Sequence, residues 1–330
     1  MTSTVTRRGV LRSAGLATAA FSLAACSSGN TKSGAGADKV RLSVGVDPAY
    51  APIYLAQRDG MFDTAGVAVE FVQVEGGAAG VQNISAGTTH LSVNADATVI
   101  PVAAKSDKIA AIASFEHSDT YFKVVLRKGV EPADIHSMVY FPGLGEYMTG
   151  KYLRSVGREP SDIKMVSAAP PDFDAILSRG DADGCVIFDP WVSRAVKQGA
   201  RVVAESKDFD AGFSQWIIAD ATWLESNQKT AGIVVDVLGK AAARIRKDPD
   251  LGVRATAKQV DVPQKTAESA VSDIHFEVRG FTDEDFRASR DLVRFLTSVD
   301  AVDGEVDLPK VMRRGWYARH AGAAGPSSGA

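Results

Sequence analysis

Acidic and aromatic side chains gather at the turns that follow apolar stretches of this 330-residue chain. The acids are Asp47, Asp96, Glu116, Glu146 and Asp189, and the aromatic residues are Tyr50, Phe115, Tyr147, Trp191 and Trp216. No arginine or lysine occupies these turns. Carboxylates accept hydrogen bonds from N–H groups, and aromatic faces attract flat or cationic groups. The pattern therefore favours a small, planar, nitrogen-containing solute, such as a pyrimidine-type precursor, over an oxyanion, which needs cationic or dense N–H donors.

Some of these positions also allow a purely structural interpretation. Asp96 follows Asn94 at a strand-to-helix turn, where an aspartate commonly caps the helix. Glu146 begins another helical stretch, so it too is either a ligand contact or a cap. Gly77 precedes a helix in Gly76-Gly77-Ala78. Its N–H group would face a ligand if the helix N-terminus opens into a site, and otherwise the segment is a plain turn.

The elements that position these residues alternate between strand and helix. In the first half, period-two and apolar runs predict strands at 40–46, 67–74, 91–93 and 109–115, with helices at 50–58, 78–86 and 97–104. A second set has strands at 122–126, 137–141, 163–166, 184–188 and 202–204, with helices at 146–156, 173–179 and 192–198. Such alternation predicts two largely parallel sheets. Open sheets bind ligands at the carboxyl ends of their strands, so the candidate residues should converge in one cleft between lobes.

The same pattern predicts how the chain divides. We expect a first lobe of residues 39–117 plus 212–320 and a second lobe of residues 118–211, with 216–218 returning to the first sheet. The chain would then pass between the lobes twice. These two connecting segments, the crossings, would form a hinge about which the lobes close on a ligand. The last third should be mainly helical, and one helix start is detailed, because Thr282 suits an N-cap with Asp285 at the third helical position.

The first 26 residues have the layout of an export signal. A basic segment with Arg7-Arg8 precedes an apolar stretch of about 13 residues, which is too short to span a bilayer. The stretch ends in Leu-Ala-Ala-Cys at 23–26, which resembles the lipobox of a bacterial lipoprotein signal. Cys26 would become the lipidated first residue, anchored to the outer face of the cytoplasmic membrane. The arginine pair resembles a twin-arginine (Tat) signal, although Sec signals also begin with arginines.

The flanking segments and the composition narrow the class of protein further. Residues 27–38 form a Gly/Ser-rich tether, and residues 321–330 a small-residue tail that we expect to be disordered. The formal net charge is −3, and the signal contributes three arginines and no acid, so the chain without its signal is still more negative. Because a nucleic-acid-binding protein needs a basic face, a nucleic-acid partner is not expected. With Cys26 committed to lipid, Cys185 has no disulfide partner, and its apolar surroundings predict a buried thiol.

Catalytic and metal-binding patterns are not found. The five histidines show no spacing with Cys, Asp or Glu that suits a metal. There is no Gly-x-Ser-x-Gly and no phosphate-binding loop. We therefore expect neither an enzyme nor a bound metal or cofactor.

Several short motifs together carry a resemblance to a known family. Residues 51–62 read Ala-Pro-Ile-Tyr-Leu-Ala-Gln-Arg-Asp-Gly-Met-Phe, and further glycines follow at 66, 76, 77 and 87. Gly180-Asp181-Ala182-Asp183 then precedes Asp189-Pro190-Trp191. Their order and spacing over about residues 40–219 resemble the solute-binding proteins of ABC importers for nitrate, sulfonate, taurine and thiamine precursors. His90 stands where that family usually has Asp, and Asp189 where it has Glu.

This resemblance implies the two-lobed α/β fold of type II periplasmic binding proteins, in which each lobe is a mostly parallel sheet flanked by helices and the ligand lies between lobes. It implies a monomer that delivers a small solute to an ABC permease and its ATPase. A sulfonate-, nitrate- or taurine-type oxyanion remains the alternative solute. A pyrimidine-precursor synthase shares the fold, but that enzyme would bring a Cys-rich loop, for which Cys185 is the only candidate thiol.

Overall fold

The computed structural model describes residues 39–303 and 305–321. The expected export signal with Cys26 and the expected tether lie outside the described residues, as does all of the expected tail except Ala321.

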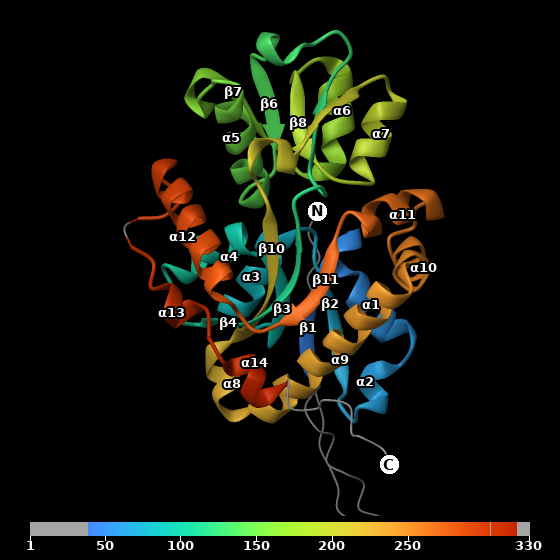
Figure 1. The fold of residues 1–330 in the computed structure, drawn as a ribbon, viewed down its shortest axis with the longest axis vertical. Helices are drawn as coiled ribbons and strands as arrows, with labels where there is room; N and C mark the ends of the chain where they lie inside the picture. The colour runs from blue at the N-terminus through green and yellow to red at the C-terminus, as the bar shows by residue number, and fades with distance from the viewer. Residues whose placement is uncertain (1–38, 304, 322–330) are drawn as a thin grey trace, which may run out of the picture. The chain divides into compact units, whose positions relative to one another are not determined.

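The first sheet has six strands in the order β11-β4-β10-β3-β1-β2 (Figure 1). The strands are β1 (Val40–Val44), β2 (Val69–Gln73), β3 (Leu91–Ala95), β4 (Ile109–Ser118), β10 (Phe213–Asp220) and β11 (His275–Arg279). β1 pairs in parallel with β2 and with β3. β10 lies antiparallel between β3 and β4, and β11 pairs antiparallel with β4. Most strands therefore share one direction, as expected, while β10 and β11 run against it.

Helices from both ends of the chain cover this sheet. The early ones are α1 (Ala51–Arg58), α2 (Met61–Thr64), α3 (Gly77–Ser85) and α4 (Asp96–Ala103), with the short helix η1 (Pro48–Tyr50) before them. The late ones are α8 (Ala221–Ser226), α9 (Gln228–Lys247), α10 (Pro249–Gln259), α11 (Gln264–Ser272), α12 (Asp283–Ser298), α13 (Leu308–Val311) and α14 (Trp316–His320). α9 packs on β11 and α1, because Val234, Leu238, Ala241 and Ile245 form one buried stripe at helical spacing.

The second sheet has five strands in the order β7-β6-β8-β5-β9. They are β5 (Lys123–Leu126), β6 (Ser137–Tyr140), β7 (Lys164–Ser167), β8 (Gly184–Ile187) and β9 (Arg201–Glu205). Its helices are α5 (Leu144–Ser155), α6 (Phe173–Arg179) and α7 (Trp191–Lys197), and short helices lie at η2 (Pro132–Asp134), η3 (Pro160–Asp162), η4 (Pro170–Asp172) and η5 (Ser206–Phe209). β6 is parallel to β7 and β8, and β5 is antiparallel to β8 and β9.

Two neighbouring segments join the sheets. The chain leaves the first sheet after β4 and returns through η5 into β10, which pairs with β4 along its whole length. Lys123 ties this junction together, because its Nζ donates to Asp273 Oδ2 at 2.9 Å and to Glu205 Oε1 at 3.1 Å. Ser118 Oγ donates to the carbonyl oxygen of Asp273 at 2.5 Å. The end of α11 is thus bonded to both the first crossing and the second sheet.

The two-lobed α/β architecture agrees with the sequence-based prediction, and so do several details. The predicted strand at 216–218 is the centre of β10 in the first sheet. Thr282 Oγ1 accepts a hydrogen bond from Asp285 N, and Asp285 Oδ2 accepts one from Thr282 N, which completes the predicted capping box. Cys185 is fully buried. The expected helical last third also contains β11, a short strand that the periodicity did not reveal.

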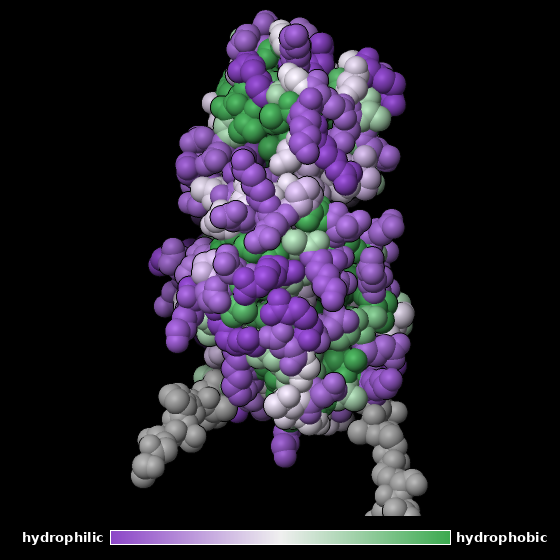
Figure 2. Space-filling model, turned by 90° about the vertical axis from the view of Figure 1, so that its right-hand side faces the viewer, coloured by the Kyte–Doolittle hydropathy of each residue, from purple (hydrophilic) through white to green (hydrophobic). Residues whose placement is uncertain are grey.

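The surface carries polar and apolar residues side by side, with an apolar patch on the second lobe (Figure 2). Exposed large apolar side chains of that lobe include Val156, Val196 and Val202. Within the described part of the chain, we find no helix with the length and apolar character needed to cross a bilayer.

Asp183 of the Gly-Asp-Ala-Asp motif holds the second sheet together. Its Oδ2 accepts hydrogen bonds from the backbone N–H groups of His136 and Ser137 at 2.9 and 3.0 Å, and its Oδ1 pairs with Arg127 Nη2 at 2.8 Å. These bonds join the start of β6 to the loops beside β5 and β8. They also lower the pKa of Asp183 despite the opposing effect of burial.

We expect Asp183→Ala to lower the free energy of unfolding by about 3 kcal/mol, because it leaves buried N–H groups and a guanidinium without their acceptor. Asp181→Ala is the matched control, since Asp181 is exposed and pairs with Arg179 at the surface. Urea denaturation of both variants measures the difference. Equal stability of the two would show that the Asp183 network contributes little.

Candidate functional site

A cavity of about 370 Å³ opens between the two lobes. The first lobe lines it with Asp47, Tyr50, Glu75, Gly76, Gly77, Ala78, Ala95, Thr98, Phe213 and Gln215. The second lobe adds Phe141, Pro142, Leu144, Ser167, Ala168, Ala169, Pro170 and Phe188, and the first crossing adds Tyr121 and Phe122. Among these described lining residues there is no Lys, Arg or His. The cavity is therefore apolar and aromatic with acidic positions.

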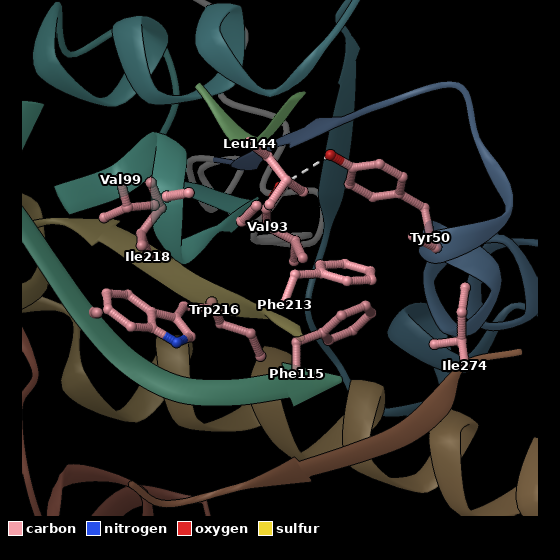
Figure 3. Packing of buried hydrophobic residues seen from close by; sticks show 14 of the residues in the cluster. Tyr50, Val93, Val99, Phe115, Leu144, Phe213, Trp216, Ile218 and Ile274 are labelled. Atoms are coloured by element: carbon pink, nitrogen blue, oxygen red, sulfur yellow. Dashed lines mark hydrogen bonds between the residues drawn. The ribbon is translucent and has the colours of Figure 1, made fainter. Parts of the chain in front are cut away.

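The loop after β1 brings Asp47 and Tyr50 to the cavity. Asp47 Oδ1 accepts a hydrogen bond from Ala49 N at 2.8 Å and so caps η1. Tyr54 Oη donates to the carbonyl oxygen of Gly45 at 2.7 Å and accepts from Asp47 N at 3.2 Å. Tyr50 Oη donates to the carbonyl oxygen of Val93 at 3.1 Å (Figure 3). These bonds fix the loop on the sheet, so the second oxygen of Asp47 is not needed to hold it.

Glu116 lies next to this loop on β4, and it is completely buried. Neither of its carboxyl oxygens has a hydrogen-bond partner within the described structure. Burial raises its pKa strongly, and the negative charge of Asp47 raises it further. Gln215 lies opposite Glu116 in the β4–β10 ladder, lines the cavity, and also has an Oε1 that no described residue contacts by a hydrogen bond.

Burial also shifts the neighbouring aspartates. It raises the pKa of Asp47 to about 6, although the hydrogen bond from Ala49 N works in the opposite direction. The Tyr121 hydroxyl lies close enough to lower that pKa slightly, yet it forms no hydrogen bond of regular geometry in the described structure. Burial likewise raises the pKa of Asp96 to about 7. Several carboxyl groups around the cleft therefore keep their protons at pH values at which an aspartate or glutamate is ordinarily ionised.

The N-terminus of α3 forms another part of the wall. Gly76 adopts a φ of 90°, a conformation that favours glycine, and no side chain caps this helix. Asn94 fixes the start of α3, because its Nδ2 donates to the carbonyl oxygen of Gly77 at 2.8 Å and its Oδ1 accepts from Ser92 Oγ at 2.6 Å. The first N–H groups of α3 are thus available to a ligand in the cavity.

Aromatic rings form the remaining wall. Tyr121 stacks on Phe188 with ring centroids 5.1 Å apart, and Phe122 meets Phe213 edge to face at 5.1 Å. Phe141 packs against Phe122 and Phe188. The sequence analysis singled out none of these five rings, nor Gln215. Position along the chain could have indicated three of them, because Tyr121, Phe122 and Phe213 flank the two predicted crossings.

Of the residues proposed from the sequence, Asp47, Tyr50 and Gly77 line the cavity, and Glu116 lies beside them. The others lie elsewhere. Phe115 and Trp216 are enclosed in the core of the first lobe (Figure 3), where Trp216 meets Phe281 edge to face at 5.5 Å. Alternation along β10 places Trp216 on the face opposite to Gln215, and Phe115 lies at an irregularity of the β4–β10 ladder; neither ring is among the described residues that line the cavity.

The second-lobe candidates also differ from the prediction. Asp189 Oδ1 accepts hydrogen bonds from Ser193 N and Ser193 Oγ at 2.9 and 2.6 Å, so it stabilises the first turn of α7. Trp191 lies under the guanidinium of Arg194, 4.5 Å from its ring centroid. Neither is among the described residues that line the cavity.

The remaining four candidates, Asn94, Asp96, Glu146 and Tyr147, lie outside the described lining of the cavity. Asp96 Oδ1 accepts from Ala97 N at 2.7 Å, and Asn94 holds α3 as described. Tyr147 packs edge to face on Phe295 at 5.0 Å, and Glu146 beside it is half-buried in the first turn of α5. None of these four lines the cavity in the described structure. The described residues also contain no group of three or more His, Cys, Asp or Glu that could hold a metal ion.

Comparison with known proteins adds a family and a fold. Residues 47–251 match the family model described as "NMT1/THI5 like". No curated protein matches the chain. The chain is similar to the periplasmic aliphatic sulphonate-binding protein SsuA from Escherichia coli, with 17% identity and a TM-score of 0.73 over 84% of this chain and 92% of that chain.

Two further solved structures are similar to the chain. The alkanesulfonate-binding protein SsuA from Xanthomonas axonopodis pv. citri bound to MOPS has 14% identity and a TM-score of 0.71, over 84% of this chain and 97% of that one. The periplasmic nitrate-binding protein NrtA from Synechocystis PCC 6803 has 12% identity and a TM-score of 0.68, over 84% of this chain and 86% of that one. The fold is therefore that of periplasmic binding proteins.

We expect Glu116→Gln to stabilise the protein at neutral and alkaline pH. In the unfolded chain a glutamate loses its proton near pH 4.3, whereas burial keeps Glu116 protonated in the folded state. Between the pKa of Glu116 in the unfolded chain and its higher pKa in the folded state, the parent therefore loses up to about 1.4 kcal/mol of stability per pH unit, and the variant does not. This pH-dependent difference in stability between the parent and the variant should vanish near pH 4.

Urea unfolding at several pH values measures this difference, with exposed Glu225→Gln as the control for loss of one charge. A difference between Glu116→Gln and the parent that is constant across pH would contradict the raised pKa.

Proposed function

The chain belongs to the NMT1/THI5-like family, and from this premise we propose that it is an extracytoplasmic solute-binding protein of an ABC importer. In this role it captures a small solute in the cleft and delivers it to a permease and its ATPase. The fold supports the proposal, since two solved structures of similar fold are described as the ligand-binding component of an ABC-type import system and as the periplasmic sulfonate-binding protein of a putative ABC transporter. The cavity supports it as well, because it is concave, largely apolar and lined from both lobes.

The solute is, as first candidate, a small planar compound with nitrogen donors. One observation carries this choice: the described lining has aromatic rings and acidic side chains but no Lys, Arg or His. Tyr121, Phe188 and Tyr50 offer flat faces, and Asp47 offers a carboxylate oxygen. A pyrimidine-type compound suits such a site, because its ring stacks and its amino group donates hydrogen bonds.

A sulfonate or nitrate is the second candidate. The solved relatives support it better than the first, because SsuA and NrtA are named as sulphonate- and nitrate-binding proteins. One feature of the cleft also favours it, since the uncapped N-terminus of α3 presents N–H groups to an anion. At identities of 17% and 12%, however, the likeness extends to the fold and leaves the choice of solute to the cleft.

The lobes would move about the two crossings. We assign residues 39–117 and 212–320 to the first lobe and 118–211 to the second, a division that separates the two sheets except for Ser118, the last residue of β4. A solute that contacts both walls, such as Tyr50 and Phe188, would favour the closed arrangement.

An enzymatic role of the synthase type has less support. It would need a reactive thiol, and Cys185 is buried within the second sheet with a raised pKa. A buried thiol of this kind is inert.

We propose that the chain is exported and anchored by lipid at Cys26, which lies outside the described residues. The motif at residues 23–26 and the arginine pair at 7–8 support this part of the proposal. Export agrees with the periplasmic location that the names of two similar proteins give.

A solute screen tests the function. We expect at least one heteroaromatic amine to raise the melting temperature and to compact the protein in small-angle scattering, with 1:1 stoichiometry. At 100 times its Kd a single solute stabilises by about 2.7 kcal/mol. Asp47→Asn should weaken binding about tenfold, through loss of a charged acceptor. Tight binding of nitrate or an alkanesulfonate, with no response to amines, would select the second candidate, and no response to any solute would contradict the proposed function.

Replacement of the N-terminal residues tests export and anchoring. Cys26→Ala should release the protein from the membrane fraction or leave it unprocessed, because no thiol is left to carry lipid. Arg7→Lys together with Arg8→Lys should block export if the protein is a Tat substrate and should hardly affect export if it is a Sec substrate. Unchanged membrane association and unchanged labelling by a fatty-acid precursor in Cys26→Ala would refute the anchor.

A further inference from the structure

Four polar groups lie together around the cleft, and three of them have buried side-chain atoms without a hydrogen-bond partner in the described structure. We call Asp47, Glu116, Tyr121 and Gln215 the acceptor cluster. Both oxygens of Glu116, Oε1 of Gln215 and Oη of Tyr121 are buried without a hydrogen-bond partner. Asp47 uses Oδ1 to cap η1. Buried polar atoms in native proteins are nearly always paired, so an unpaired group of this size indicates a missing partner.

The cluster lies at the cavity rather than inside the core. Asp47, Tyr121 and Gln215 line the cavity, and Glu116 is opposite Gln215 in the β4–β10 ladder. The ionised forms of Asp47 and Glu116 both raise the pKa values of Tyr50 and Tyr121, in addition to the larger effect of burial, so these groups lie within electrostatic reach of one another. Asp47 and Gln215 thus offer oxygens at the surface of the cavity, and Glu116 lies behind them as a further acceptor.

The elements packed around Glu116 supply no cation to neutralise it. From β10 it meets the neutral Gln215, and from β11 the apolar Phe276. Its neighbour His117 is exposed, and its ring packs at a tilt against that of His275 instead. Arg279 of β11 lies opposite Ser114 and is already paired with Asp285 at 2.6 Å. A positive partner for the cluster must therefore come from the cavity.

We propose that the acceptor cluster is a cation subsite, which selects a flat solute whose head group carries positive charge and at least two N–H donors, such as an amidinium or a protonated aminopyrimidine. This inference rests on the proposed function and specifies one end of the cleft. Two N–H groups would donate to the oxygens of Asp47 and Gln215, and the charge would be balanced by Asp47 and Glu116 together. Tyr121, stacked on Phe188, would cover the ring.

Binding of such a cation releases a proton. In the empty cleft Glu116 retains its proton, because burial and the charge of Asp47 disfavour a second carboxylate. When the cation arrives, the O–H bond of the Glu116 carboxyl breaks, the proton passes to solvent, and the carboxylate that remains balances the charge of the solute. The net charge of the site is unchanged, because the positive charge of the solute replaces that of the released proton, and no other reactant is needed.

Three compounds with the same ring test the inference: benzamidinium, neutral benzamide and benzenesulfonate. Calorimetry of the mature protein at pH 7 should show that benzamidinium binds about tenfold or more tightly than benzamide. Repeating the titration in buffers of different ionisation enthalpy should show release of close to one proton for each benzamidinium bound. Benzamide should release none.

Two variants and one control localise the effect. Glu116→Gln should abolish proton release and weaken benzamidinium about tenfold, with little effect on benzamide. Asp47→Asn should weaken the binding of benzamidinium as well, and it replaces Glu116→Gln as the test if that variant does not fold. Asp174→Asn is the matched control, because Asp174 also has a buried unpartnered oxygen but lies in a separate cavity with Arg127 and Gln198. It should leave all three affinities unchanged.

Other outcomes would overturn the inference. No saturable binding of benzamidinium in the millimolar range, equal affinity for benzamidinium and benzamide, or identical binding by the parent and Glu116→Gln would each show that water rather than a cation partners the cluster. Benzenesulfonate binding with lobe compaction, and no preference for the amidinium, would reject the cation subsite. It would leave the proposed solute-binding function standing.

Discussion

The antiparallel pairing of β4 with β10 is the constraint on which the rest of the structure depends. The chain leaves the first sheet along one of these strands and returns along the other, so both crossings are held side by side. The second sheet is connected to the first through this ladder. Lys123 and Ser118 donate hydrogen bonds to Asp273, which joins the connection to the end of α11. The same ladder places Glu116 opposite Gln215 at the cavity.

The electrostatics of the two lobes contrast. Asp183 in the second lobe is buried with a full set of donors, so its charge is stabilised and its pKa is lowered. Asp47 and Glu116 at the cleft lack such compensation, and burial raises their pKa values. Unpaired buried acids reduce folding stability, so their presence at a cavity is typical of a site shaped by ligand binding rather than by folding.

The sequence predicted the repeating architecture better than the site. Hydrophobic periodicity depends on local spacing, so it located most strands and helices, the return of β10 and the capping box at Thr282. It missed β11, a five-residue strand at the sheet edge next to β4. For the site, proximity to a strand end singled out Asp47, Tyr50 and Gly77, which line the cavity. It could not determine which way a side chain points, so Trp216 is enclosed in the core and Asp189 bonds within its own helix turn.

The wall of the cavity and the joint between the lobes are made largely from the same stretch of chain. Tyr121 and Phe122 lie between β4 and β5, and Phe213 begins β10 immediately after the return crossing. A substitution that reshapes the aromatic wall therefore also alters the stiffness of the joint. In an evolving lineage, a change of cargo and a change in how fast the lobes open would be inherited together. Lining residues that lie away from the crossings, such as Gly77 at the start of α3 and Pro170 at the start of η4, are places where the cavity can change without altering the joint.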